Sequence, residues 1–211
     1  TILATKPAET VNVPVMVMQD GFITSHCVEP VDVLDDKAVE KFVGKFRNPT
    51  GLLGDKPQSV GPFALPNSFF EFKIAQEKRT LQAKEQFLKI GAELAKLTKC
   101  KYYFYEPYQV EDATAVIVTM SSTAGTTKAV VDRMRAKGKK VGLLKVRTFR
   151  PFPNKGIAKA LANVPVVGIF ERTHTTGSFG GPLFNEVRSA LYENDTHPPV
   201  LGYYGGLGGR D

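Results

Sequence analysis

Cysteine and histidine are scarce in this 211-residue chain, which contains two cysteines and three histidines. Cys27 and Cys100 lie far apart in the sequence, and no CxxC pair or Cys/His spacing suited to zinc is present. The same scarcity excludes a cysteine-ligated iron–sulfur cluster formed by this chain alone. We therefore expect two free thiols in a reducing compartment.

Long apolar runs are also lacking. No stretch approaches the roughly 20 apolar residues that a membrane-spanning helix needs, and the first residues do not show the basic-then-apolar pattern of a secretory signal. The hydrophobic fraction of 42% and the charged fraction of 23% are ordinary for a globular domain. This composition predicts a soluble, cytoplasmic protein that does not bind a membrane.

Signatures of nucleotide binding and of hydrolysis are missing as well. No GxGxxG or GxxxxGK[ST] motif occurs, and no histidine lies near a nucleophile in a Gx[SC]xG turn. From these absences we assign no catalytic, cofactor-binding or metal-ligating residue in this chain.

Positive charge is present but unevenly distributed. The net charge is +7. Residues 1–66 contain 6 Lys and Arg against 8 Asp and Glu, which gives −2, so the rest of the chain carries +9. The basic residues lack the interleaved aromatic side chains of single-stranded nucleic-acid sites. A solvated basic face is favoured over an acidic protein partner, and nucleic acid is the least favoured.

The first third of the chain has a weak pattern of regular structure. Residues 1–66 hold seven of the fourteen prolines, and only residues 13–18 read as a strand. Prolines and glycines in 31–66 predict that this stretch has no helix or sheet of its own, so we expect it to pack on a neighbouring domain or subunit. Its apolar side chains are Val31, Val33, Leu34, Phe42, Phe46, Leu52 and Leu53.

From Ser68 onward the apolar pattern becomes regular. Apolar residues that recur every seven positions predict a long amphipathic helix over 69–98, with Gly91 as its weak point. Beyond it we predict strands at 102–105, 114–120, 140–146, 165–170 and 199–204, and helices at 124–137, 154–162 and 181–192. Continuously apolar strands are typical of a mainly parallel sheet with helices on both faces, so residues 67–211 should form a three-layer α/β domain.

Small residues fill the turns after three of these strands, in "SSTAGTT" (121–127), "GSFGGP" (177–182) and "GGLGG" (205–209). Such turns can hold anions, because helix N-termini present free N–H groups there. Tight turns and helix caps explain the same residues and are favoured. The arginines after the strand at 140–146 could grip an anion or pair with acids. The anion-loop candidates are Thr123, Gly125, Thr126, Arg147 and Arg150.

Four stretches, in order, carry a resemblance: "PVMVMQDGFITSH", "MSSTAGTTKAVVDRMRAKGKKVGLLKVRTFRPFP", "FGGPLFNEVRSAL" and "YYGGLGGRD". They resemble the C-terminal half of the α subunit of the 2-oxoacid:ferredoxin oxidoreductases, closest to the pyruvate-oxidising members, called pyruvate:ferredoxin oxidoreductase or pyruvate synthase. The resemblance covers nearly the whole chain, and residues 31–66 are its least distinctive part.

The resemblance implies a multi-subunit thiamine diphosphate enzyme that decarboxylates a 2-oxoacid, forms acyl-CoA and passes electrons through iron–sulfur clusters to ferredoxin. Residues 1–66 would be the tail of a preceding thiamine-binding domain with its linker, and residues 67–211 would resemble the C-terminal domain of transketolase. Thiamine diphosphate, Mg and the [4Fe-4S] clusters would be bound elsewhere in the complex. This chain would then support assembly, with other subunits or domains as its partners and ferredoxin reached through another subunit.

The stretch "QDGFITSH" (19–26) has two interpretations. Its aspartate and histidine could form an acid/base pair, although a loop aspartate more often caps its own turn. Within the resemblance, this stretch is the exit turn of the strand at 13–18 and lies at a domain junction, where the glycine relaxes the backbone and the phenylalanine is anchored in apolar surface. The junction candidates are Asp20, Gly21, Phe22, Thr24, Ser25 and His26.

Three alternatives remain beside a pyruvate-oxidising subunit. The same family implies oxalate or another 2-oxoacid as substrates, and no residue here is assigned to reading the substrate side chain. The residues alone also allow a stand-alone phosphate- or nucleotide-binding α/β module that uses the "SSTAGTT" turn. A purely structural subunit is the third alternative.

Overall fold

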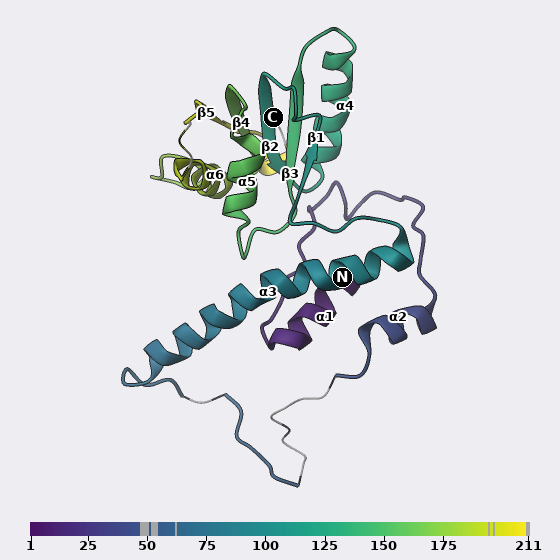
Figure 1. The fold of residues 1–211 in the computed structure, drawn as a ribbon, viewed down its shortest axis with the longest axis vertical. Helices are drawn as coiled ribbons and strands as arrows, with labels where there is room; N and C mark the ends of the chain where they lie inside the picture. The colour runs from purple at the N-terminus through teal and green to yellow at the C-terminus, as the bar shows by residue number, and fades with distance from the viewer. Residues whose placement is uncertain (47–50, 52–54, 62, 194, 196, 210–211) are drawn as a thin grey trace. The chain divides into compact units, whose positions relative to one another are not determined.

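A computed structural model describes residues 1–46, 51, 55–61, 63–193, 195 and 197–209 (Figure 1). The chain forms two compact units. Unit 1 comprises residues 1–18 and 29–102, and unit 2 comprises residues 19–28 and 103–211. No helix among the described residues is both long enough and apolar enough to cross a membrane.

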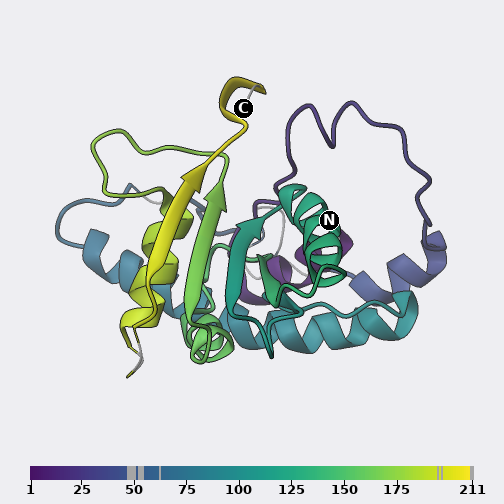
Figure 2. The same cartoon turned by 90° about the horizontal axis from the view of Figure 1, so that it is seen from above.

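Unit 1 is built around the long helix α3 (Phe69–Thr98), whose bounds confirm the helix predicted over 69–98. Helix α1 (Ile2–Val11) packs against α3, and both views show the two helices side by side (Figures 1 and 2). Pro7 and Val11 are the buried residues of α1. Because burial compensates for the helix hydrogen bond that a proline cannot make, the helix continues through Pro7.

Helix α2 (Asp36–Val43) also belongs to unit 1, and it contradicts the prediction that residues 31–66 have no helix. Asp35 caps its first turn by accepting a 3.0 Å hydrogen bond from the N–H of Ala38, and Gly44 ends it with a φ of 77°. These are ordinary start and stop signals. The prolines of this stretch lie outside α2, so counting them overestimated how far they disrupt the chain.

A small core joins these helices. Phe42 of α2 is buried against Ile90 and Leu94 of α3. This packing corrects the prediction that the whole of 31–66 needs another domain or subunit to cover it. Of the other apolar side chains in that stretch, Leu34 is packed against this core, Val31, Val33 and Phe46 are exposed, and Leu52 and Leu53 lie outside the described residues.

Residues 13–18 do not form a strand, contrary to the prediction. A strand is held by pairing with a neighbour, and none of the strands described in this chain pairs with this segment. Its side chains Val15, Met16 and Met18 are exposed. That the segment completes a sheet in another domain stays a prediction.

Unit 2 contains a five-stranded sheet in the order β1-β3-β2-β4-β5. Strand β1 is antiparallel to β3, while the pairs β2–β3, β2–β4 and β4–β5 are parallel. Four strands begin within one residue of their predicted starts, and β1 begins three residues later than predicted. The strands are β1 (Tyr105–Tyr108), β2 (Ala115–Met120), β3 (Val141–Val146), β4 (Val166–Glu171) and β5 (Val200–Tyr204).

Helices cover both faces of this sheet, as Figure 1 shows for α4 on one side and α5 and α6 on the other. Their bounds are α4 (Thr123–Arg135), α5 (Asn154–Leu161) and α6 (Pro182–Tyr192). The main core lies between the sheet and α5 and α6, with Val118, Leu161 and Val187 among its fully buried side chains. On the opposite face, Val131 of α4 packs with Leu143 of β3. The predicted α/β class with a mainly parallel sheet is confirmed.

The two units divide after Tyr102, whereas we predicted a domain boundary after Pro66. The difference arises because α3 packs with α1 and α2 through its C-terminal third and therefore belongs to unit 1. Farther towards its N-terminus, α3 leaves its apolar stripe exposed, including Ile74 and Leu81.

Candidate functional site

The carboxyl ends of the four parallel strands gather at one edge of the unit 2 sheet, and the glycine-rich turns follow there (Figure 2). Strands β2 and β4 are adjacent in the middle of the sheet. The chain continues from β2 to β3 on one side of this pair and from β4 to β5 on the other side. Open α/β sheets commonly bind ligands where such connections diverge. This edge is therefore the candidate functional site.

Asp20 reaches this edge from far away in the sequence. Its Oδ2 accepts a 2.5 Å hydrogen bond from the backbone N–H of Ser122, directly before α4, and both residues belong to unit 2. A carboxylate is favourable at this position because the first N–H groups of a helix lack partners and the helix dipole is positive there. Asp20, a predicted junction residue, thus contacts the predicted anion loop at 121–127. The anion at this helix start is the carboxylate of Asp20 itself.

Residues 21–26 form a turn that closes on itself. Ser25 Oγ accepts a 2.9 Å hydrogen bond from the N–H of Phe22 and lies 2.8 Å from Nδ1 of His26. The rings of Phe22 and His26 stack with centroids 4.9 Å apart. The acid/base pair of Asp20 and His26 is not formed, because the hydrogen-bond partner of the imidazole is Ser25.

The expected roles of Gly21 and Phe22 in this turn differ from what the structure shows in this chain. The residue with a left-handed backbone is Phe22, with a φ of 60°, and not Gly21. The Phe22 ring is 72% exposed in this chain, so its anchoring in apolar surface stays a prediction. The carbonyl of Thr24 lies 3.5 Å from the thiol of Cys27, which closes the end of the turn.

The anion-loop candidates Thr123, Gly125 and Thr126 lie in the first turn of α4. The N–H groups of Ala124 and Gly125 donate to carbonyl groups of the preceding turn, at 3.3 and 2.9 Å. Because Asp20 takes the N–H before them, the chain itself uses these donors. The geometry therefore favours a capped helix start over a phosphate-binding loop.

The arginines after β3 pair with acids. Arg147 lies 2.9 Å from Glu106 of β1, which also forms a 2.5 Å ion pair with Lys128 of α4. The hydrogen bond from Lys128 lowers the pKa of the Glu106 carboxyl, and the charges of Lys128 and Arg147 add to this effect against partial burial. Arg150 forms a 2.6 Å ion pair with Glu186 of α6. Of the two interpretations of these arginines, pairing with acids is the one observed.

A buried acid at the end of β4, Glu171, was not predicted from the sequence. Glu171 is 7% exposed, and its two carboxylate oxygens accept hydrogen bonds from the N–H groups of Leu183 and Phe184, at 2.8 and 3.0 Å. A side chain at Gly181 would clash with this carboxylate. The available signal was an acid that ends an apolar strand shortly before a Gly-Gly-Pro helix start.

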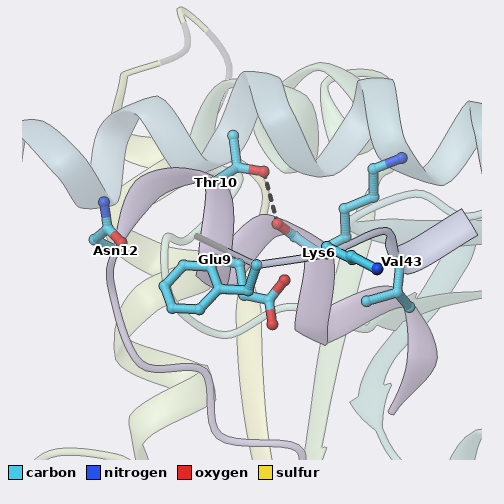
Figure 3. A pocket seen from close by; sticks show the side chains of 7 residues that line it. Lys6, Glu9, Thr10, Asn12 and Val43 are labelled. Carbon is cyan, nitrogen blue, oxygen red and sulfur yellow. Dashed lines mark hydrogen bonds between the residues drawn. The ribbon is translucent and has the colours of Figure 1, made fainter. Parts of the chain in front are cut away.

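Unit 1 has a pocket of about 400 Å³ between α1 and the end of α2 (Figure 3). Lys6 is engaged by a 2.7 Å ion pair with Glu93, and the hydroxyl of Thr10 donates to the carbonyl of Lys6 at 2.7 Å. The labelled side chains do not converge on one point, so the pocket does not have the geometry of a catalytic centre. Its lining residues are Lys6, Glu9, Thr10, Asn12, Val43, Lys45 and Phe46.

Within the part of the chain that the structure describes, no three His, Cys, Asp or Glu side chains are grouped as metal ligands. Cys27 and Cys100 are exposed free thiols that belong to different units. The described residues therefore do not offer the oxygen ligands of a magnesium-diphosphate site or the cysteine ligands of an iron–sulfur cluster.

Comparison with known proteins gives two family matches. Residues 1–91 match the family described as "Pyruvate flavodoxin/ferredoxin oxidoreductase, thiamine diP-bdg". Residues 113–211 match the family described as "Pyruvate:ferredoxin oxidoreductase core domain II". The division after Tyr102 falls between the two matched ranges, whereas residues 19–28 of unit 2 lie within the first range.

Individual relatives match along the full chain. The chain is 42% identical over 214 residues to the pyruvate synthase subunit PorA of Thermotoga maritima and 37% identical over 213 residues to the ketoisovalerate oxidoreductase subunit VorA of Pyrococcus furiosus. Each alignment covers 100% of this chain and 54% of the relative, so the chain spans about half the length of the curated relatives it matches. A solved 2-oxoglutarate:ferredoxin oxidoreductase from Magnetococcus marinus is similar over 80% of this chain and 27% of its own, with a TM-score of 0.48 and 17% identity.

Proposed function

The chain belongs to the 2-oxoacid:ferredoxin oxidoreductases as part of an α subunit, and from this membership we propose that it is a segment of an enzyme that oxidises pyruvate. The complete enzyme decarboxylates the 2-oxoacid, forms acyl-CoA and passes electrons to ferredoxin. The observation that carries the choice of pyruvate is the 42% identity to a pyruvate synthase subunit over the whole chain. The 37% identity to a ketoisovalerate oxidoreductase subunit makes a branched-chain 2-oxoacid the first alternative, ahead of oxalate.

In this proposal the cofactors are bound by other parts of the enzyme. Thiamine diphosphate, magnesium and [4Fe-4S] clusters need ligand groups that the described residues of this chain do not assemble. The partners are other subunits or domains of the same cytoplasmic oxidoreductase, and ferredoxin is bound through another subunit.

The substrate assignment is tested with the intact enzyme complex. Initial rates are measured with coenzyme A and a viologen dye for pyruvate, 3-methyl-2-oxobutanoate, 2-oxoglutarate and oxalate. We expect kcat/KM to be highest for pyruvate. A higher value for one of the others would replace pyruvate but keep the reaction class, whereas turnover of none of the four would overturn the proposed function.

Within that enzyme, this segment supports assembly, and residues 19–28 act as a junction. The end of the preceding thiamine-binding domain with its linker is proposed to extend beyond the predicted boundary at residue 66 and to include α3 of unit 1, and unit 2 is proposed to be the supporting domain. The junction is supported by the 2.5 Å bond between Asp20 and Ser122, because it fixes residues 19–28 to unit 2 while their sequence neighbours belong to unit 1. The capped start of α4 also makes a stand-alone phosphate-binding module less favourable.

The junction is tested by Asp20→Ala, with Glu29→Gln as the matched loss of an exposed acid nearby. We expect Asp20→Ala to lower the yield of assembled complex and to speed proteolysis after Phe22, while kcat per assembled complex stays unchanged. Glu29→Gln should change neither quantity. If Asp20→Ala assembles normally but loses kcat, the segment takes part in catalysis and the junction proposal is wrong.

A further inference from the structure

Arg172 lies at the same edge of the sheet, and neither the junction nor the ion pairs account for it. It directly follows β4, and its half-buried side chain lies against the glycine turn that follows β5, with Nη2 3.5 Å from the carbonyl oxygen of Gly206. A Cβ at Gly206, whose φ is 69°, would come within 2.7 Å of the Arg172 Nε. The glycine therefore allows the guanidinium to approach the backbone closely.

Two further polar rings come from the segments at the same two strand ends. The rings of His174 and Tyr204 meet edge to face, with centroids 5.1 Å apart. Tyr204 is the last residue of β5 and pairs in register with Glu171, the residue before Arg172. Figure 2 shows the loop after β4 and the turn after β5 leaving the same end of the sheet. A guanidinium, an imidazole and a phenol thus come from two adjacent strand ends.

Arg172 differs from the other arginines at this end of the sheet in its ion pairing. Arg147 and Arg150 have carboxylate partners, whereas the ion pairs formed by the described residues do not include Arg172. The adjacent acid, Glu171, directs both oxygens to the start of α6. With respect to the described residues, the guanidinium therefore keeps donors available, in the planar arrangement that suits two oxygens of one anion.

We propose that Arg172, His174 and Tyr204 form a binding site for an oxyanion, the phosphate or carboxylate group of a small molecule. Arg172 supplies the positive charge and a two-point hydrogen bond. The phenol hydroxyl of Tyr204 and a ring N–H of His174 supply single donors. The site lies at the carboxyl ends of β4 and β5, beside the point between β2 and β4 where the connections diverge, and it does not depend on the start of α4, which Asp20 already occupies.

The test is calorimetry on the purified 211-residue chain in an anion-poor buffer, with inorganic phosphate in one arm and acetate in the other. We expect one of the two to bind with a Kd in the millimolar range or tighter, and the tighter one identifies the group. Arg172→Gln should weaken that binding at least tenfold. Arg133→Gln removes an exposed arginine of α4 that takes part in none of the described ion pairs, so it should bind like the wild type.

Tyr204→Phe provides a second measurement, because it removes only the hydroxyl and leaves the ring contact with His174 in place. We expect it to weaken binding severalfold, and circular dichroism should show an unchanged fold. The proposal is overturned if the wild-type chain binds neither anion, or if folded Arg172→Gln binds as tightly as the wild type. If Arg172→Gln does not fold, unchanged binding by Tyr204→Phe overturns it instead.

Discussion

Two carboxylates, each remote from the helix it caps, hold the starts of two helices at the same edge of the sheet. Asp20 accepts the N–H of Ser122 before α4, and Glu171 accepts those of Leu183 and Phe184 in α6. The residues at the usual cap position of α4 and α6 make no side-chain cap bond of their own. A helix cap typically contributes about 1 kcal/mol, and here it also links distant parts of unit 2. The same residues neutralise helix starts that could otherwise attract an anion.

Glu171 should be the more important of the two for stability, because it is buried. Replacing it with alanine leaves two buried N–H groups without acceptors, so we expect Glu171→Ala to lower the free energy of unfolding by about 2 to 4 kcal/mol. Glu186→Ala, also an acid of unit 2, removes an exposed ion pair and should cost less than about 1 kcal/mol. Urea unfolding of both variants measures the difference. Equal losses would show that burial does not strengthen the Glu171 cap.

The ion pairs of Glu106 predict a specific pH dependence. The pKa of this carboxyl is lowered from its ordinary value of 4.5, chiefly by the hydrogen bond from Lys128. A depressed pKa stabilises the fold above the unfolded-state value, and this contribution is lost as the pH falls from about 4.5 through the folded-state pKa. Because the side chain is about one-third exposed, we expect a contribution of only about 1 kcal/mol.

Glu106→Gln should therefore lower the free energy of unfolding at pH 7, and the difference from wild type should shrink as the pH falls below 4.5. Glu111→Gln, an exposed acid with none of the described ion pairs, serves as the control and should follow the wild type. Urea unfolding at pH 7, 4 and 3 tests this expectation. A difference that grows towards acid pH would contradict the sign derived from the lowered pKa.

At the scale of elements, the periodic parts of the sequence were predictable and the short helices of unit 1 were not. Helix α3 has both predicted bounds, because its apolar repeat is long and sustained. Neither α1, which contains Pro7, nor α2 was predicted, although Asp35 and Gly44 mark the two ends of α2. Burial on α3 favours both short helices, and a pattern read along the sequence does not contain that tertiary contact.

The candidate site was predictable in the same partial way. The stretch 19–26 and the turn 121–127 could each be selected for their loop residues. Their contact could not be derived, because Asp20 and Ser122 are 102 residues apart and only the fold brings them together. Arg172 was missed for the same reason, since nothing in the local sequence shows what its side chain faces, whereas Glu171 was missed although its place between an apolar strand and a Gly-Gly-Pro helix start was visible.

Helix α3 offers a direct comparison between a buried and an exposed leucine on one element. Leu94 is 3% exposed and packs with Phe42, whereas Leu81 is 50% exposed. In the isolated chain, Leu94→Ala should therefore cost about 2 to 4 kcal/mol of unfolding free energy, and Leu81→Ala less than about 1 kcal/mol. Chemical denaturation of both variants is the measurement. A large loss from Leu81→Ala would mean that the apolar stripe of α3 is covered within this chain.

At the scale of the whole molecule, exposed apolar side chains gather on several surfaces. They occur in residues 13–33, on the N-terminal two-thirds of α3 and on β5. Leu201 and Tyr203 belong to β5, which is an outermost strand of the sheet. Full burial of one such side chain contributes about 1.5 to 3 kcal/mol, and monomeric proteins seldom leave large apolar patches exposed. We infer that these surfaces are covered by other domains or subunits of the enzyme.

Limited proteolysis with chymotrypsin tests this inference, and the chain contains its own internal control. Phe22 and Phe63 are 72% and 87% exposed, whereas Phe42 of α2 is 7% exposed. We expect the isolated chain to be cleaved first after Phe22 and Phe63 and much later after Phe42, because a protease needs an accessible, locally open segment. In the assembled enzyme, cleavage at the two exposed sites should slow at least tenfold. If the isolated chain resists cleavage after Phe22 and Phe63 as well as the complex does, these segments are already covered within the chain and need no partner. If the complex is cleaved there as fast as the isolated chain, the segments face solvent in the enzyme, and the inferred contact with other domains or subunits is wrong.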